Sequence, residues 1–303
     1  MPFICAGEIP FADRSQANSA EAIFAIVGIK PMDINEIKSK DREIYSAEPG
    51  RDFFYASESA NIISDLERQW MDKVVATRLL RTNLIALDVG CGTGVDVSWI
   101  KERSSLVVAL DQSLNSLRAA AKRFKDDREI LLVQGDAESL PLDYDSMDII
   151  YCGSILHHLP RYENAIREFH YILKRDGAVL ASEPCAYNPF AVIRRRFFPS
   201  IYHTADERPF PPKELISCFT RYFDCVYYRK CYFFAINASL VEKLLGKSVA
   251  RLYLKVSLLV DSILMAIPVI GQFCWRIDIV AFKASSDSIH DHGVRISSGH
   301  TFC

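Results

Sequence analysis

Short apolar runs alternate with helical patterns through the middle of the chain. Runs of mainly apolar residues occupy 84–89, 106–110, 129–133, 147–151 and 178–182. Between them, apolar residues recur at three- and four-residue spacing, most clearly over 113–124 and 162–173, which predicts amphipathic helices. Buried strands that alternate with helices indicate a parallel sheet with helices on both faces.

The flanks of this segment have a different pattern. Apolar positions over 57–80 predict a helix, whereas six prolines between residues 184 and 213 interrupt any single regular element. Residues 223–234 and 275–282 predict a sixth and a seventh strand. The expected fold is therefore an α/β protein with a doubly wound, seven-stranded, mostly parallel sheet and helical and loop insertions that form a cap.

The chain divides into five parts on this pattern. They are an N-terminal extension that contributes to the cap (1–56), the α/β core (57–183), a proline-rich lid (184–222), the last two strands with a helical insertion at 236–274 (223–283), and a polar tail (284–303). We expect the tail to be disordered, because it is terminal and its residues are small and polar.

Composition narrows the possible functions. Half of the residues are hydrophobic, which excludes a wholly disordered chain, and the net charge of −2 argues against a general nucleic-acid binder. Nine cysteines without a C-x-x-C motif predict reduced thiols in a cytoplasmic protein. No signal peptide is evident at the start, and the longest uncharged run, 262–275, is too short to span a bilayer.

The candidate chemistry begins where the first strand ends. The sequence there is Asp88-Val-Gly90-Cys91-Gly92-Thr-Gly94. Glycines at such a turn let a ligand approach the backbone closely. A dinucleotide fingerprint requires glycine at 95, where this chain has valine, and a carboxylate at 88 repels a pyrophosphate. S-adenosylmethionine carries an ammonium, a sulfonium and no phosphate, so the charges favour it.

This stretch resembles motif I of class I S-adenosylmethionine-dependent methyltransferases, and the resemblance covers about residues 84–183. It is closest to the small-molecule group with the ubiquinone and menaquinone enzymes, and it implies a Rossmann-like methyltransferase fold. In the family an acid at Asp111 takes the ribose hydroxyls, and an acid at Asp136 accepts from the adenine amino group. Capping of the helix that begins near Ser113 is the alternative role for Asp111. The implied cofactor site comprises Asp88, Gly90, Cys91, Gly92, Gly94, Asp111, Gln112, Asp136, Ala137 and Cys152, with Cys152 as a pocket-wall residue.

Methyl transfer to a hydroxyl or an acidic carbon also requires a base. The first candidates, His157 and His158, follow the fourth strand, and we expect only one of two adjacent helical residues to face the pocket. The alternative is that both shape the helix surface. Glu183 ends the fifth strand, and His203 lies in an H-x-x-D-E segment of the lid that is similar to segments of related bacterial methyltransferases. We predict no metal site, because the histidines of a disordered tail have no preformed geometry.

The insertion at 236–274 goes beyond the family core. Val241, Leu244, Leu245, Val249, Leu252, Val256 and Leu259 share one face of a predicted helix over 241–260. Lys243, Lys247, Arg251 and Lys255 recur every four residues on another face. Such a helix resembles a membrane-surface element, drawn to anionic lipid at the inner face of a membrane. The alternative is a cap helix packed on its own domain.

These features together predict a methyltransferase that moves a methyl group from S-adenosylmethionine to an O, N or C atom of a small or lipid-like acceptor. Two alternatives stay open. One is a family member that binds the cofactor but does other chemistry or none. The other is a dinucleotide-dependent oxidoreductase, which Val95 disfavours.

Overall fold

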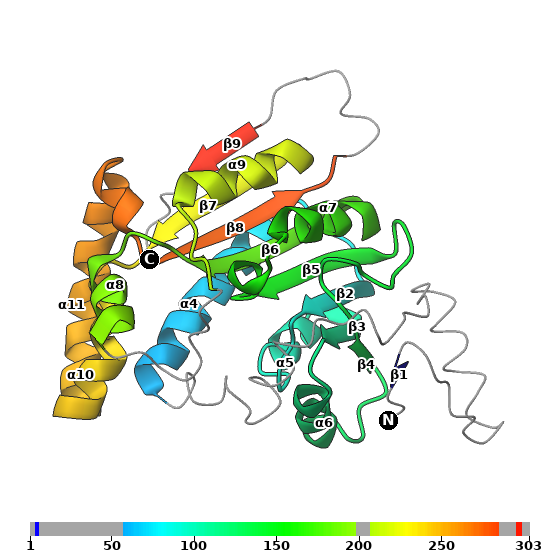
Figure 1. Cartoon of the computed structure of the whole chain (residues 1–303), viewed down its shortest axis with the longest axis horizontal. Coiled ribbons are helices and arrows are strands. Elements are labelled where there is room, and N and C mark those ends of the chain that lie inside the picture. The colour runs from blue at the N-terminus through cyan, green and yellow to red at the C-terminus, as the bar shows by residue number, and fades with distance from the viewer. Residues whose placement is uncertain (1–3, 6–56, 198–206, 285–294, 299–303) are drawn as a thin grey trace.

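A nine-stranded sheet forms the centre of the computed structural model, which describes residues 4–5, 57–197, 207–284 and 295–298 (Figure 1). Its strand order is β1-β4-β3-β2-β5-β6-β8-β7-β9. The strands are β1 (Ile4–Cys5), β2 (Leu84–Val89), β3 (Ser104–Asp111), β4 (Ile130–Gln134), β5 (Met147–Gly153), β6 (Leu173–Pro184), β7 (Cys225–Cys231), β8 (Arg276–Phe282) and β9 (Arg295–Ser298). Neighbouring strands are parallel, except that β8 runs antiparallel to both β6 and β7.

The seven predicted strands are β2 to β8, and their mostly parallel arrangement confirms the predicted fold class. The pattern did not predict the two edge strands β1 and β9. β9 lies in the tail that was expected to be disordered, and that expectation is wrong for residues 295–298, because they pair with β7 and form the outermost strand on that side. The other tail residues from 285 on, and the N-terminal extension apart from β1, lie outside the described residues.

Helices cover both faces of the sheet, as predicted (Figure 1). One face carries α4 (Glu58–Val75), α5 (Val97–Lys101) and α6 (Leu114–Arg123), and the other carries α7 (Tyr162–Ile172) and α9 (Pro212–Tyr222). Ser57 and Ser113 cap α4 and α6 through their side chains. The helices predicted over 57–80, 113–124 and 162–173 are therefore confirmed as α4, α6 and α7.

The cap lies beyond one end of the sheet, at the left of Figure 1. It consists of α8 (Pro189–Phe197), α10 (Ala238–Leu245) and α11 (Lys247–Ala266), with short 3₁₀ turns at Ala235–Asn237 and Ile270–Phe273. The single helix predicted over 241–260 is wrong: the chain breaks at Gly246, whose φ of +84° is favoured only for glycine. No helix in the described part of the chain is long and apolar enough to cross a membrane.

Candidate active site

A cavity of about 990 Å³ opens where the carboxyl ends of the parallel strands meet. Gly90 follows β2, Asp111 ends β3, Asp136 follows β4 and Ser154 follows β5, and all four line the cavity. In open α/β sheets ligands bind at this end of the strands. The sequence-predicted residues are therefore brought together at the edge of the sheet where the fold places a ligand.

The glycine turn after β2 forms one wall of the cavity. Gly90, Gly92 and Gly94 all have positive φ angles, of +69°, +54° and +79°. A Cβ atom at Gly94 would lie 2.5 Å from the Phe124 ring, so this glycine serves packing against α6. A Cβ atom at Gly92 would meet nothing within 4 Å, and Gly92 faces the open cavity. Gly92 is thus the position where a ligand can approach the backbone.

Asp111 joins the glycine turn to the start of α6. Its carboxylate accepts hydrogen bonds from the backbone N–H of Gly92 and of Ser113, each at 2.8 Å. The side-chain cap of α6 is Ser113, so Asp111 does not fill the capping role that was its alternative. Gln112, Asp136 and Ala137 line the same wall. The acid at the end of β3 thus holds the turn in place while its carboxylate borders the cavity.

Several predicted cofactor residues lie behind the wall rather than on it. Asp88, Cys91, Gly94 and Cys152 do not line the cavity, and the side chains of Asp88, Cys91 and Cys152 are buried. The prediction that Cys152 is a pocket-wall residue is therefore wrong. Burial raises the pKa of the Cys152 thiol well above its usual value, with the Glu183 carboxylate adding to the effect. This thiol is not poised as a nucleophile.

His157 and Glu183 form a buried pair at the base of the cavity. The Nδ1 atom of His157 lies 2.7 Å from Oε2 of Glu183, and the other carboxylate oxygen accepts from the backbone N–H of Ile155 and Leu156 at 2.9 Å. Glu183 is fully buried and does not line the cavity, whereas His157 does. The carboxylate therefore orients the imidazole, which leaves Nε2 of His157 as the nitrogen available for chemistry.

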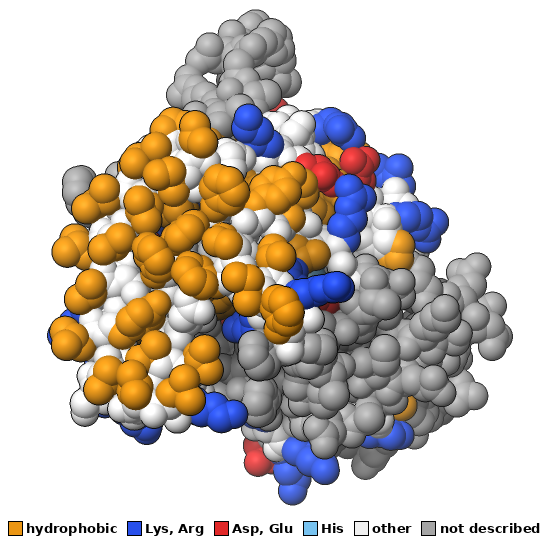
Figure 2. All heavy atoms as spheres, turned by 60° about the vertical axis from the view of Figure 1, so that its left-hand side comes forward, with side chains coloured by type: hydrophobic (Ala, Val, Ile, Leu, Met, Phe, Trp, Pro, Cys, Tyr) orange, Lys and Arg blue, Asp and Glu red, His pale blue; other side chains and the backbone are white. Residues whose placement is uncertain are grey.

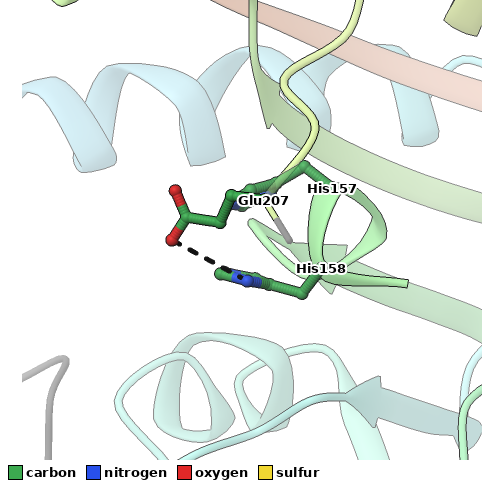
Figure 3. A group of neighbouring side chains, drawn as sticks. All are labelled: His157, His158 and Glu207. Carbon is green, nitrogen blue, oxygen red and sulfur yellow. Dashed lines mark ion pairs between the residues drawn. The ribbon is translucent and has the colours of Figure 1, made fainter. Parts of the chain in front are cut away.

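His158 also lines the cavity, contrary to the expectation that only one of the two histidines would. The two residues lie on a 3₁₀ turn (Leu156–His158) rather than a regular helix, and their ring centroids are 4.0 Å apart. Nδ1 of His158 is 3.9 Å from Oε1 of Glu207, toward which it points in Figure 3. Ligand atoms of His157, His158 and Glu207 all lie within 4.8 Å of one another, so these three side chains could share a cation.

Other predicted histidines lie outside the described residues. This holds for His203 and for the tail histidines His290, His292 and His300. Glu207 belongs to the same H-x-x-D-E segment as His203, so the motif that suggested His203 could also have suggested Glu207.

A buried network of charges, which the sequence analysis missed, closes the other side of the cavity. Glu67 of α4 pairs with Arg276 of β8 at 3.0 Å, and Arg276 also donates to the hydroxyls of Ser154 and Ser182. Burial raises the pKa of Glu67 to about 7, and Arg276 opposes this shift. The signal was present: Glu67 shares the buried face of α4 with Ile63, Trp70 and Met71. An acid among apolar residues at helical spacing indicates a buried partner.

Part of this chain is similar to known methyltransferases. Residues 87–181 match the family described as "Methyltransferase domain". The demethylmenaquinone methyltransferase of Staphylococcus carnosus (strain TM300) is 34% identical over 127 residues, which cover 41% of this chain and 53% of that protein. The protein of the same name from Staphylococcus epidermidis (strain ATCC 12228 / FDA PCI 1200) is 35% identical over the same shares. The chain spans about half the length of the curated relatives it matches.

A solved structure agrees with the fold. Phosphoethanolamine N-methyltransferase 1 of Haemonchus contortus, in complex with phosphoethanolamine and S-adenosylhomocysteine, superposes with a TM-score of 0.51 at 14% identity. The match covers 84% of this chain and 50% of that chain. The family match confirms the predicted resemblance to methyltransferases over residues 87–181, and this superposition agrees with it at the level of the fold. All ten predicted cofactor residues and both histidines of the 3₁₀ turn lie within this matched segment.

Proposed function

We propose that this protein transfers a methyl group from S-adenosylmethionine to an O, N or C atom of a small or lipid-like acceptor. One observation carries the proposal. A single cavity has the glycine turn, Asp111 and Asp136 along one wall and a carboxylate-oriented histidine, His157, on another. That is the arrangement that an in-line transfer with proton removal requires.

The described residues fit the cofactor. Gly92 leaves open space above its backbone, and the carboxylates of Asp111 and Asp136 border the same space. These acids suit neutral donors such as ribose hydroxyls and an amino group, since the ligand carries no phosphate. When bound, S-adenosylmethionine supplies a methyl group activated by the positive sulfur. Gly90, Gly92, Asp111 and Asp136 are the residues we expect to hold it.

His157 is the base that the geometry favours. The Glu183 carboxylate accepts from Nδ1–H of His157 and stabilises the imidazolium that forms when Nε2 takes a proton from the acceptor. Because Glu183 is buried behind His157, it acts on the reaction through that ring and is a positioning residue. In this proposal His157 and Glu183, which the sequence offered as separate candidates for the base, have different roles.

The lining of the cavity away from the glycine turn, where we place the acceptor, fits a partly apolar molecule. Ala191, Ile236, Leu240 and Trp275 line it, together with the basic Arg194 and Lys243. The volume of about 990 Å³ lies at the upper end of the usual range for small-molecule pockets, which leaves room for cofactor and acceptor together. The curated relatives are named for demethylmenaquinone, which is consistent with a lipid-like acceptor.

The test is a methyl-transfer assay with labelled cofactor against quinone, phenolic and lipid extracts. On the acceptor so identified, we expect His157→Ala to lower turnover by roughly 10²- to 10⁴-fold with little change in cofactor affinity. Glu183→Gln should lower kcat with little change in KM, because the imidazole of His157 loses the carboxylate that orients it. His170→Gln, on α7 away from the cavity, is the matched control.

Three outcomes would contradict the proposal or a part of it. If no extract is methylated although calorimetry shows cofactor binding, the protein belongs with family members that bind the cofactor without transferring methyl groups. If a nicotinamide dinucleotide rather than S-adenosylmethionine raises the melting temperature, the oxidoreductase alternative holds. A rate lost on chelation and restored by a divalent metal would assign His157, His158 and Glu207 to a cation instead of a base.

A further inference from the structure

The side of α11 that faces away from the domain carries a row of large apolar side chains. Val249, Leu252, Val256, Leu259 and Ile263 are exposed and recur at three- and four-residue spacing, so they share one side of the helix. Leu252 and Leu259 are 65% and 66% exposed. The side turned inward buries Leu254 and Met265 together with the polar Ser257 and Asp261. The exposed row is therefore a second apolar side, which packing on the domain does not use.

Polar contacts fix this orientation. The Asp261 carboxylate accepts hydrogen bonds from the backbone N–H of Phe234 and Ala235, at 2.9 and 3.0 Å. Tyr253 donates its hydroxyl to the carbonyl oxygen of Phe234 at 2.9 Å. Because the inward contacts include these directional hydrogen bonds, the helix is held with Leu252 and Leu259 outward.

The neighbouring helix α10 is fixed in a similar way. The Glu242 carboxylate accepts from the backbone N–H of Glu58 and Ser59, at the N-terminus of α4. The apolar side chains Leu240, Leu244 and Leu245 of α10 are exposed. Both helices of the insertion therefore turn leucines away from the domain.

The exposed apolar side chains of α8, α10, α11 and residues 267–273 gather on one side of the molecule (Figure 2). We call this surface the apolar face. Val192, Ile193 and Phe197 contribute to it from α8. An exposed apolar surface built from several elements indicates an interaction site rather than scattered surface residues.

The charges on the same helices have one dominant sign. α8, α10 and α11 contain seven basic residues and two acidic ones, Glu242 and Asp261, although the whole chain has a net charge of −2. Both acids accept hydrogen bonds from backbone N–H groups of their own domain. In Figure 2, Lys and Arg side chains lie at the edge of the apolar face.

Two of the four basic residues that recur every four positions, which we call the basic stripe (Lys243, Lys247, Arg251 and Lys255), form ion pairs within the protein. Arg251 pairs with Glu58, and Lys247 lies 4.0 Å from the same carboxylate. The Arg251 hydrogen bond lowers the pKa of Glu58. Lys243 and Lys255 are exposed, so they are the members of the stripe best placed to meet an anionic partner.

We propose that the apolar face docks on the surface of an anionic lipid bilayer. The apolar side chains enter the headgroup boundary, and the lysines and arginines around them contact lipid phosphates. A symmetric dimer through the same face would bring two basic rims together, and like charges repel. An anionic bilayer can bury the apolar side chains and also pair with the basic ones, whereas a second copy of the chain can only bury the apolar side chains.

Docking would also place the cavity next to the lipid. Arg194, Arg195, Leu240 and Lys243 line the cavity and belong to α8 and α10, which carry part of the apolar face. A lipid-like acceptor could then enter without crossing water. This consequence rests on the proposed methyl transfer, whereas the docking itself does not.

The test is co-sedimentation of the full chain with phosphatidylcholine vesicles that contain or lack phosphatidylglycerol. We expect binding to the anionic vesicles that weakens at high salt. Leu252→Ser combined with Leu259→Ser should weaken binding at least ~100-fold, since two leucines lose their apolar burial. Lys243→Gln and Lys255→Gln should each weaken it about fivefold. Leu80→Ser, at a leucine 82% exposed outside the apolar face, and Lys125→Gln, on the loop after α6, are the matched controls.

The docking proposal fails if the wild-type protein does not sediment with anionic vesicles, or if the leucine and lysine variants bind as it does. A dimer that the double leucine variant dissociates, without vesicle binding by either protein, would make the apolar face an interface between copies. Cofactor affinity measured by calorimetry shows whether each variant is folded. Methyl transfer to a water-soluble acceptor should persist in the leucine variants, so failure of docking and failure of the proposed function give different results.

Discussion

The helices α7 and α11 both turn apolar residues inward, but only α11 also buries an acid and exposes a row of large apolar side chains. α7 buries Ala165, Ile166 and Phe169 against the sheet and exposes Glu163 and Arg167. α11 buries the polar Ser257 and Asp261 beside Leu254 and Met265, and it exposes Leu252 and Leu259. α7 lies on a wide apolar sheet face that its own apolar side can cover. α11 lies beside the turn at Phe234, where backbone N–H groups need acceptors.

The difference shows that helical periodicity predicts an apolar side without predicting what it contacts. The partner decides the orientation. Where the partner is a sheet, burial of apolar area contributes most of the stability. Where the partner presents unpaired backbone donors, hydrogen bonds to buried acids hold the helix, and the apolar side stays free for another surface.

The largest expected effect is a difference between variants of α7 and of α11 in the loss of unfolding free energy. Phe169→Ala removes a fully buried ring from beneath α7 and should cost about 3–5 kcal/mol of unfolding free energy, because it leaves a cavity. Leu252→Ala on α11 removes an exposed side chain and should change the unfolding free energy by less than about 0.5 kcal/mol. Chemical denaturation of both variants measures this contrast. Equal losses would mean that α11 packs through its leucines.

A smaller effect tests the polar anchor of α11. Asp261→Ala leaves the N–H groups of Phe234 and Ala235 without their acceptor, at a cost of about 1–3 kcal/mol. Asp261→Asn keeps one carbonyl oxygen and should recover part of that loss. Ser262→Ala, at the exposed neighbouring position, is the control.

Amide hydrogen exchange should locate the Asp261→Ala effect. We expect faster exchange at residues 234–235 and along α11, with α7 unchanged. An effect spread equally over both helices would show that Asp261 supports global stability rather than the cap.

The smallest effect concerns the pH dependence of the core helix. Burial lowers the pKa of His170 on α7, and Lys283 adds to the shift. His170 therefore binds a proton less readily in the folded state than in the unfolded state. Its contribution to the unfolding free energy is complete above pH ~6.5 and is lost as the pH falls through the folded-state pKa. His170→Gln should make the unfolding free energy less dependent on pH in that range. Parallel slopes for the two proteins would contradict this.

Much of the fold and the cofactor wall could be predicted because the signals are local. The strands β2 to β6 lie within one continuous segment, and each ends beside the residues that it positions. Gly92, Asp111 and Asp136 thus reach one edge of the sheet because parallel strands present their carboxyl ends together. Apolar runs, glycine spacing and strand-end acids are properties of neighbouring residues, and the sequence alone contains them.

Only the tertiary structure decided the rest, because it depends on contacts between distant residues. Glu183 lies 26 positions after His157, and only the pairing of β5 with β6 and the 3₁₀ turn between them bring the two together. Glu67 pairs with Arg276, although most of the described chain separates the two residues in sequence. The break at Gly246 and the outward leucines of α11 follow from where acceptors were needed around Phe234 and the start of α4. Periodicity records which side of a helix is apolar, but the free energy of packing depends on the surface that the completed fold places opposite it.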